Sequence, residues 1–173
     1  KKDGIPSALY FNSKTLPKRF KIILNAHLDV VPAKPNQYKP KIVGDKLYAR
    51  GANDMKATAS VMVYLFKELS EKVSYPLGLQ LVTDEEIGGF NGTKHQIEEG
   101  ERADFVIAGE PTDLKISPKA KGITWIKVTS QGKSAHAAYP WDGENAISKM
   151  NIFLNYLYKK FPMPKKEVWK TTV

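Results

Sequence analysis

Short apolar runs separated by polar turns divide the first two thirds of the chain into segments that predict strands and helices in alternation. The runs at residues 5–11, 21–27, 77–83 and 103–108 have the length of strands. Residues 41–43 and 46–48 flank Gly44-Asp45, which is a two-residue hairpin signal. Apolar residues at helical spacing predict a helix between Asp54 and Ser70, and a shorter helix is expected at residues 93–99. The order favours an α/β fold.

The pattern changes after residue 111. Residues 123–129 alternate between apolar and polar and predict a strand, and residues 167–173 predict the beginning of another. Between them, residues 143–160 predict a helix, whose expected buried side consists of Ala146, Met150, Phe153, Leu154 and Leu157. We therefore expect two domains, residues 1–115 and residues 116–173.

Three of the predicted strands are followed by residues that can bind metal or carry protons. The run at residues 21–27 ends in His27, the run at 77–83 is followed by Asp84, Glu85 and Glu86, and the run at 103–108 is followed by Glu110. In an open α/β sheet, ligands bind outside the carboxyl ends of the strands. These side chains are therefore expected to meet at one edge of the sheet.

The spacing of these residues suggests roles for some of them. Residues two apart on a strand project from the same face, so Asp29 can hold the ring of His27, as carboxylates often hold metal-binding histidines. Adjacent residues point to opposite sides, so one of Glu85 and Glu86 can bind metal while the other faces an attacking water. Asp54 lies in a glycine-containing turn before a helix, where its alternative role is that of an N-cap.

Composition limits the chemistry and the partners. The chain is 42% hydrophobic and 26% charged, which is typical of globular proteins, and it has no cysteine. Any metal must therefore be held by nitrogen and oxygen. The net charge of +9 raises the question of a nucleic-acid partner, but the lysines are scattered and favour a solvated surface. We expect no nucleic acid, no membrane and a cytoplasmic location.

Five motifs in this order resemble one known family. They are His27-x-Asp29, residues 48–56 (YARGANDMK), residues 83–86 (TDEE), residues 108–112 (AGEPT) and residues 134–140 (SAHAAYP). The chain is similar from about residue 5 to residue 173 to the dinuclear-zinc metallopeptidases that include acetylornithine deacetylase, succinyl-diaminopimelate desuccinylase, aminoacylase and carboxypeptidase G. The resemblance implies a zinc-exopeptidase-like mixed sheet with helices, followed by the start of a smaller α+β dimerisation (lid) domain.

The resemblance also implies a set of metal ligands. His27, Asp54 and Glu110 would bind one zinc, and Asp54 would bridge to a second zinc that Glu86 also binds. Two metals roughly 4 Å apart lower the pKa of a bridging water and polarise the scissile carbonyl. Cobalt or manganese could replace zinc, because nitrogen and oxygen ligands discriminate weakly between these metals.

The catalytic roles that the resemblance implies fall on three further residues. Glu85 matches the catalytic base and Asp29 the carboxylate behind His27. His136 lies in the segment that matches the dimerisation domain, and it resembles a histidine that reaches into the partner's site of a homodimer to stabilise the oxyanion. We read His95 as a surface histidine.

The sequence departs from the family pattern in several places. Ala49 and Ala57 replace glycines, with little consequence expected. The helical segment before the first strand, the later strands and a last histidine that completes the second zinc do not appear, so both domains are expected to be incomplete and this chain alone to hydrolyse little. The first hypothesis is a metal-dependent hydrolase of amide bonds in small N-acyl amino acids or peptides. The alternative is a catalytically impaired fragment that acts as a metal-binding or dimerising module.

Overall fold

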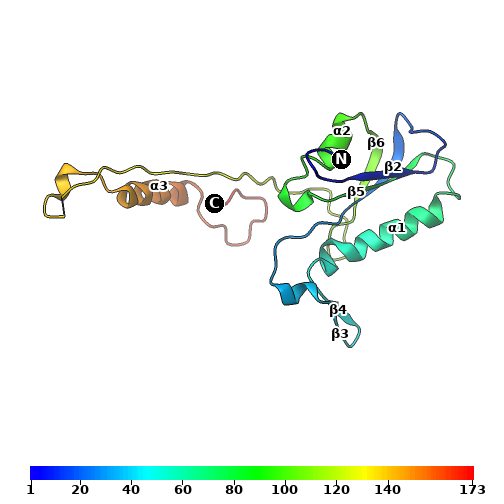
Figure 1. Cartoon of the computed structure of the whole chain (residues 1–173), viewed down its shortest axis with the longest axis horizontal. Coiled ribbons are helices and arrows are strands. Elements are labelled where there is room, and N and C mark those ends of the chain that lie inside the picture. The colour runs from blue at the N-terminus through cyan, green and yellow to red at the C-terminus, as the bar shows by residue number, and fades with distance from the viewer. The chain divides into compact units, whose positions relative to one another are not determined.

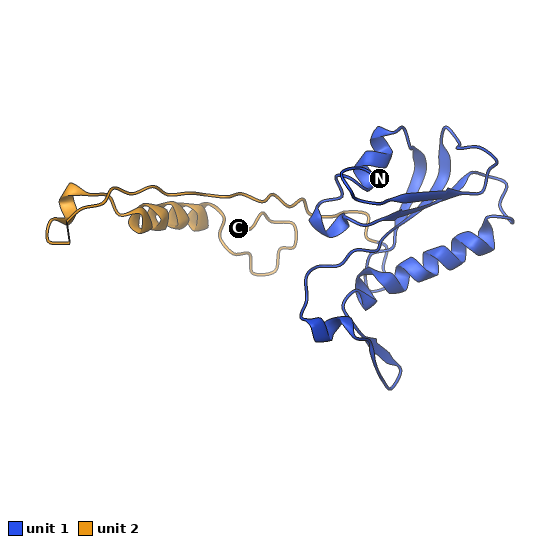
Figure 2. Ribbon diagram, viewed as in Figure 1, with its two compact units in different colours: residues 1–116 blue, residues 117–173 orange.

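The structure, a computed structural model, describes residues 1–173 and divides into two compact units, residues 1–116 and residues 117–173 (Figure 2).

A four-stranded mixed sheet forms the centre of the first unit, with strand order β1-β5-β2-β6 (Figure 1). β2 (Phe20–His27) runs parallel to β5 (Leu77–Val82) and to β6 (Ala103–Ala108), whereas β1 (Ala8–Phe11) is antiparallel to β5. The four predicted strands and the predicted mixed sheet are confirmed. Because the three parallel strands end at the same edge, His27, Glu85 and Glu110 emerge on one side of the unit.

Helices lie on both sides of this sheet, with α1 (Ala57–Leu69) on one side and α2 (Thr93–Glu98) on the other (Figure 1). Beneath α1 is the apolar core, made of Leu24, Ala26, Met55, Ala59, Met62, Leu77 and Leu79. The face toward α2 is more polar, because Asn25 donates from Nδ2 to Gln80 Oε1 at 2.6 Å and both Gln80 and Gln96 are buried. The two helices predicted in this part of the chain are confirmed.

A small hairpin and two short turns connect β2 to α1. The hairpin consists of β3 (Lys41–Val43) and β4 (Lys46–Tyr48), as predicted, and η1 (Pro35–Tyr38) precedes it. The chain then passes Gly51, whose φ of +80° favours glycine, and enters the kinked segment η2 (Ala52–Lys56). A Cβ at Gly51 would lie 2.5 Å from Val30 Cγ1. This close approach fixes the path of the chain just before Asp54.

The second unit contains α3 (Ala146–Lys160), the short turn η4 (Pro140–Asp142) and a single bridge between Lys133 and Glu144. Asn145 caps α3, because its side chain accepts from the backbone N–H groups of Ile147 and Ser148. None of the helices in either unit combines the length and the apolar composition that a membrane crossing requires.

Two expectations for the second unit are wrong. Residues 123–129 and 167–173 form no strand, because a strand needs a hydrogen-bonding neighbour and neither segment pairs with another. The predicted inner side of α3 is not buried either, since no residue of this helix is buried. The sequence has the apolar pattern of a strand and of an amphipathic helix. In this unit, however, no sheet packs against the apolar side chains and buries them.

Candidate metal centre

His27 is the residue around which the site is built. It ends β2, its side chain is only 1% exposed, and its backbone N–H points to Met55 Sδ at 3.2 Å. Its ring Nδ1 lies 3.1 Å from the carbonyl oxygen of Asp29 and 3.4 Å from Asp29 Oδ1. A proton on Nδ1 satisfies these acceptors and leaves Nε2 free to bind a cation. The pairing that the spacing of His27 and Asp29 predicts is therefore present.

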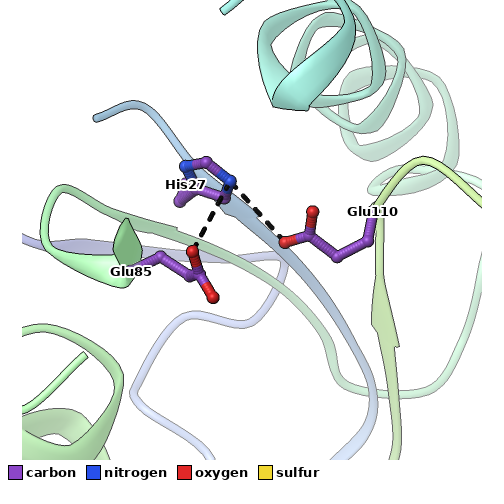
Figure 3. Close-up of side chains that lie close together, drawn as sticks. All are labelled: His27, Glu85 and Glu110. Atoms are coloured by element: carbon purple, nitrogen blue, oxygen red, sulfur yellow. Dashed lines mark ion pairs between the residues drawn. The ribbon is translucent and has the colours of Figure 1, made fainter. Parts of the chain in front are cut away.

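Carboxylates surround the other ring nitrogen. His27 Nε2 lies 3.0 Å from Asp54 Oδ1, 3.6 Å from Glu110 Oε1 and 3.9 Å from Glu85 Oε2. Figure 3 shows Glu85 and Glu110 turned toward the ring from two sides. Two overlapping groups of donor atoms result: His27 with Glu85 and Glu110, and His27 with Asp54 and Glu86, each with all its atoms within 4.8 Å of one another.

Asp54 reaches this position through an irregular stretch of backbone. Within η2 its φ and ψ are −115° and 103°, which is not helical, and no side chain makes a capping hydrogen bond at the start of α1. The residue at the N-cap of α1 is Lys56. The alternative role of Asp54 as an N-cap is therefore wrong, and its carboxylate is 54% exposed beside His27.

The two glutamates are presented by the short turn η3 (Glu85–Ile87), which follows β5. The carboxylate of Asp29 accepts the backbone N–H of Glu85 at 3.2 Å and that of Glu86 at 3.0 Å. Glu86 Oε1 in turn accepts the N–H of Val31 at 3.3 Å. Asp29 thus contacts both the ring of His27 and the start of the turn, which links the two halves of the site.

Asp84 is a feature of the site that the sequence analysis left without a role. It is 1% exposed, and its Oδ2 accepts the N–H groups of Asn91 and Gly92 at 2.8 and 3.0 Å. The sequence did contain a sign that Asp84 is buried. Asp84 lies two residues after Val82, a buried residue at the end of β5, and so falls on the same inward face.

The electrostatics of the site favour protons where no cation is bound. Burial lowers the pKa of His27, but the hydrogen bond to Asp54 and the charge of Glu110 outweigh it, so this pKa lies above its ordinary value. Burial raises the pKa of the Glu85 and Glu110 carboxyls above their usual range, and the neighbouring carboxylates add to this while His27 opposes it. A divalent cation would replace these protons and relieve the repulsion.

The residues fit a divalent metal. Zinc–ligand bonds of about 2.0–2.1 Å in a tetrahedral arrangement place neighbouring donor atoms about 3.3 Å apart. The separations from Nε2 to Asp54, Glu110 and Glu85, between 3.0 and 3.9 Å, bracket that value. Nitrogen and oxygen donors without sulfur suit zinc, cobalt or manganese.

His136 belongs to the second unit. Its ring centroid lies 5.6 Å from that of Tyr139, which in turn lies 5.7 Å from the ring of Trp141 in an edge-on arrangement. The other six residues predicted for the site lie together at the carboxyl edge of the sheet.

The chain is similar to known proteins over most of its length. The chain is 33% identical over 164 residues to a probable carboxypeptidase of Emericella nidulans, covering 86% of this chain and 39% of that protein. It is 36% identical over 157 residues to a probable carboxypeptidase of Paracoccidioides lutzii, covering 81% and 35%. The chain thus spans well under half the length of these relatives.

A solved structure and a family model extend the comparison. The crystal structure of an M20 family metallo-carboxypeptidase, Sso-CP2 from Sulfolobus solfataricus, matches with a TM-score of 0.51 and 28% identity, covering 63% of this chain and 27% of that one. The model of peptidase family M20/M25/M40 matches residues 23–165, which include the second part of β2 and all the residues gathered around His27. The chain belongs to peptidase family M20/M25/M40.

Proposed function

We propose that the full-length protein to which this chain belongs is a metal-dependent hydrolase that releases the C-terminal residue of a peptide or the acyl group of a small N-acyl amino acid. The observation that carries the proposal is the convergence of His27 Nε2 with the carboxylates of Asp54, Glu85 and Glu110 at separations suited to one cation. The names of the curated relatives favour peptides as substrates.

The metal would be held by His27, Asp54 and Glu110, with Asp54 and Glu86 holding a second ion, and we propose zinc for both. When bound, such ions lower the pKa of a bridging water and polarise the carbonyl that is attacked. Asp29 keeps the His27 ring oriented through Nδ1.

Glu85 is proposed to move the proton. Its Oε2 lies 3.9 Å from His27 Nε2 and its side chain is 53% exposed, so the carboxylate is open to a water that approaches the site and can accept and return a proton. It would accept a proton from the attacking water and donate it to the leaving amine. His136 is proposed to stabilise the oxyanion in the partner's site of a homodimer, which rests on the family resemblance of its segment.

The test uses the full-length protein. After dialysis against a chelator, release of free amino acid from blocked dipeptides and from N-acetyl amino acids is measured before and after zinc, cobalt or manganese is added. We expect hydrolysis to disappear with the metal and to return with it. Hydrolysis that survives complete removal of metal would contradict the proposal.

A matched pair of variants links that activity to the site. Asp54→Asn keeps the volume of the side chain but weakens a metal ligand, so bound zinc and turnover should both fall. Asp113→Asn makes the same change at a side chain that is 92% exposed in the first unit, and it should retain both. Equal zinc content in the two variants would exclude Asp54 as a ligand.

A further inference from the structure

We propose that Asp84 is a positioning residue: its carboxylate closes the loop that carries Glu85 and Glu86, and so sets where these two side chains stand beside His27. The inference rests on the proposed function for the roles of the two glutamates. It assigns a task to a residue that contacts neither the substrate nor the metal.

The loop from residue 84 to residue 92 begins and ends on Asp84. The backbone carbonyl of Asp84 accepts the N–H of Gly89 at 2.7 Å and that of Ile87 at 3.3 Å. Its Oδ2 accepts the N–H groups of Asn91 and Gly92 at 2.8 and 3.0 Å. One residue thus accepts four hydrogen bonds from the loop that follows it, and the carboxylate supplies the two that close the loop.

The same turn is held from the other side by Asp29. Because the Asp29 carboxylate accepts the N–H groups of Glu85 and Glu86, the backbone of both glutamates lies between two fixed acceptors. A catalytic carboxylate displaced by about 1 Å can cost on the order of 100-fold in rate, so the anchoring of this turn matters for turnover.

The second oxygen of Asp84 makes the arrangement costly. Oδ1 is buried and has no hydrogen-bond partner, which is rare for a carboxylate oxygen in a folded protein. It also sits against Gly92, where a Cβ would lie only 2.2 Å from it and 3.0 Å from Val82 Cβ. A buried carboxylate oxygen without a partner, beside a functional turn, is the pattern expected where position is maintained at the expense of stability.

Gly92 therefore offers a way to move the Asp84 carboxylate without changing Asp84. Gly92→Ala forces Oδ1 to rotate away, which breaks the bonds that Oδ2 makes to Asn91 and Gly92. Asp84→Ala removes the same bonds directly. Asp84→Asn keeps a carbonyl oxygen that can accept both N–H groups, so it is the conservative variant that should recover the function.

The experiment measures zinc affinity by calorimetry, kcat and KM for hydrolysis, and thermal unfolding, all on the full-length protein. We expect Asp84→Ala and Gly92→Ala to lower kcat and zinc affinity by about 10- to 100-fold with KM changed less than about threefold, in the range typical of residues that orient metal ligands. Asp84→Asn should recover most of both losses. The controls Asp113→Asn and Gly122→Ala, the latter at a glycine with nothing within 4 Å of an added Cβ, should match the wild type.

Several results would overturn the inference. They are wild-type kcat and zinc affinity in folded Asp84→Ala, and losses in Asp84→Asn as large as those in Asp84→Ala. If Asp84→Ala does not fold, the test rests on Gly92→Ala, and wild-type kcat and zinc affinity in that variant overturn the inference. A wild type that binds no zinc overturns the proposed function, whereas equal zinc affinity in wild type and Asp84→Ala overturns this inference alone.

Discussion

His27 is a neutral ring by default, yet its Nε2 faces three carboxylates, of which Asp54 is the nearest at 3.0 Å. Like charges in such proximity are tolerated when protons or cations separate them. Because the pKa values of His27, Glu85 and Glu110 are raised, each of these groups holds its proton to a higher pH than usual when no cation is bound. Metal binding must therefore release protons, and metal affinity rises with pH.

A first prediction separates the two adjacent glutamates in the full-length protein. Glu85→Gln keeps the volume but cannot accept a proton, so metal content should persist while kcat falls by about 10²- to 10⁴-fold. Glu86→Gln should instead weaken metal binding and lose activity that added zinc partly restores. Metal analysis and steady-state kinetics on both variants check this.

The outcome that would contradict this assignment is the reverse pattern. Zinc rescue of Glu85→Gln together with full metal content in Glu86→Gln would exchange the two roles. The geometry makes this contrast necessary, because Glu85 Oε2 lies only 3.9 Å from His27 Nε2 and proximity alone groups Glu85 with the ligands.

At this scale the sequence predicted which residues gather at the sheet edge, but it did not predict which residue positions the loop that bears Glu85 and Glu86. Strand ends predicted where His27, Glu85 and Glu110 gather, because the carboxyl edge of a parallel sheet is a property of topology. The task of Asp84 depends on which atoms of the loop 84–92 fold back onto its carboxylate, and that is decided by the three-dimensional path of the loop. The sequence offered only its inward register and the glycine at position 92.

At the scale of elements, α1 packs on one face of the sheet and covers the apolar core (Figure 1). Met62 is 6% exposed and reaches the backbone at Gly109, where an added Cβ would lie 2.9 Å from Met62 Cε. Gly109 precedes Glu110, so the packing of α1 supports the segment that carries one of the proposed ligands. Met55 packs at the same place, because its Cε would lie 2.8 Å from a Cβ added at Gly109.

Met62→Ala should therefore cost stability. Removal of a buried methionine side chain typically costs about 2–5 kcal/mol in the free energy of unfolding. Val61→Ala, at the neighbouring position that is 55% exposed, should change it by less than about 0.5 kcal/mol. Urea unfolding of the two variants checks the difference, and equal midpoints would contradict the packing described for α1.

The polar face of the sheet predicts a pH dependence of stability outside the metal site. Burial raises the pKa of Glu101, opposed by the hydrogen bond that Gln80 Nε2 donates to it at 3.3 Å. The folded chain thus holds this proton more tightly than the unfolded chain. The stabilising contribution is fully present below the unfolded pKa of about 4.3 and is lost as pH rises through the higher folded pKa.

Glu101→Gln, which is neutral at every pH, should remove this dependence. The unfolding midpoint of the wild type should fall relative to that of the variant as pH rises from about 4 toward 7. Glu71→Gln, at an exposed position on the same unit, serves as the control and should run parallel to the wild type. Thermal scans in one buffer series at constant salt measure the unfolding midpoints of the three proteins at each pH. The same pH dependence of the midpoint in all three would contradict the prediction.

Strand prediction succeeded where a neighbouring strand exists and failed where none does, whereas the helix predicted at residues 143–160 formed as α3 although none of its residues is buried. The pattern of β2, β5 and β6 was realised because each of these strands pairs with another within the first unit. The alternation at residues 123–129 is of the same kind, yet these residues form no strand. Periodicity shows which side chains could be buried on one face of an element. Whether they are buried depends on another strand or helix that packs against that face.

At the scale of the whole molecule, the second unit leaves large apolar side chains exposed. Trp125 is 94% exposed, Ile123 80% and Ile126 77%. Proteins seldom leave such a run in contact with water, and an exposed apolar patch commonly marks an interaction site. The predicted homodimer offers a second copy as its cover.

Self-association of the full-length protein is therefore expected through this segment. Light scattering should give the mass of two chains, and Trp125→Ser should shift the equilibrium toward one chain. Trp141→Ser, at a residue that is 73% exposed in η4, is the matched control and should leave the mass at two chains. A wild type that stays monomeric at high concentration would contradict this prediction.

The strand order has a consequence for the timing of assembly. β2 lies between β5 and β6, so the second strand of the chain obtains its neighbours only after about half the chain beyond it has been made. His27 consequently waits for Glu110, 83 residues later, before the two can share a cation. Such long-range pairing slows folding. A cation that requires both side chains can bind fully only after these strands have paired, so we expect it to lengthen the lifetime of the folded state without hastening its formation.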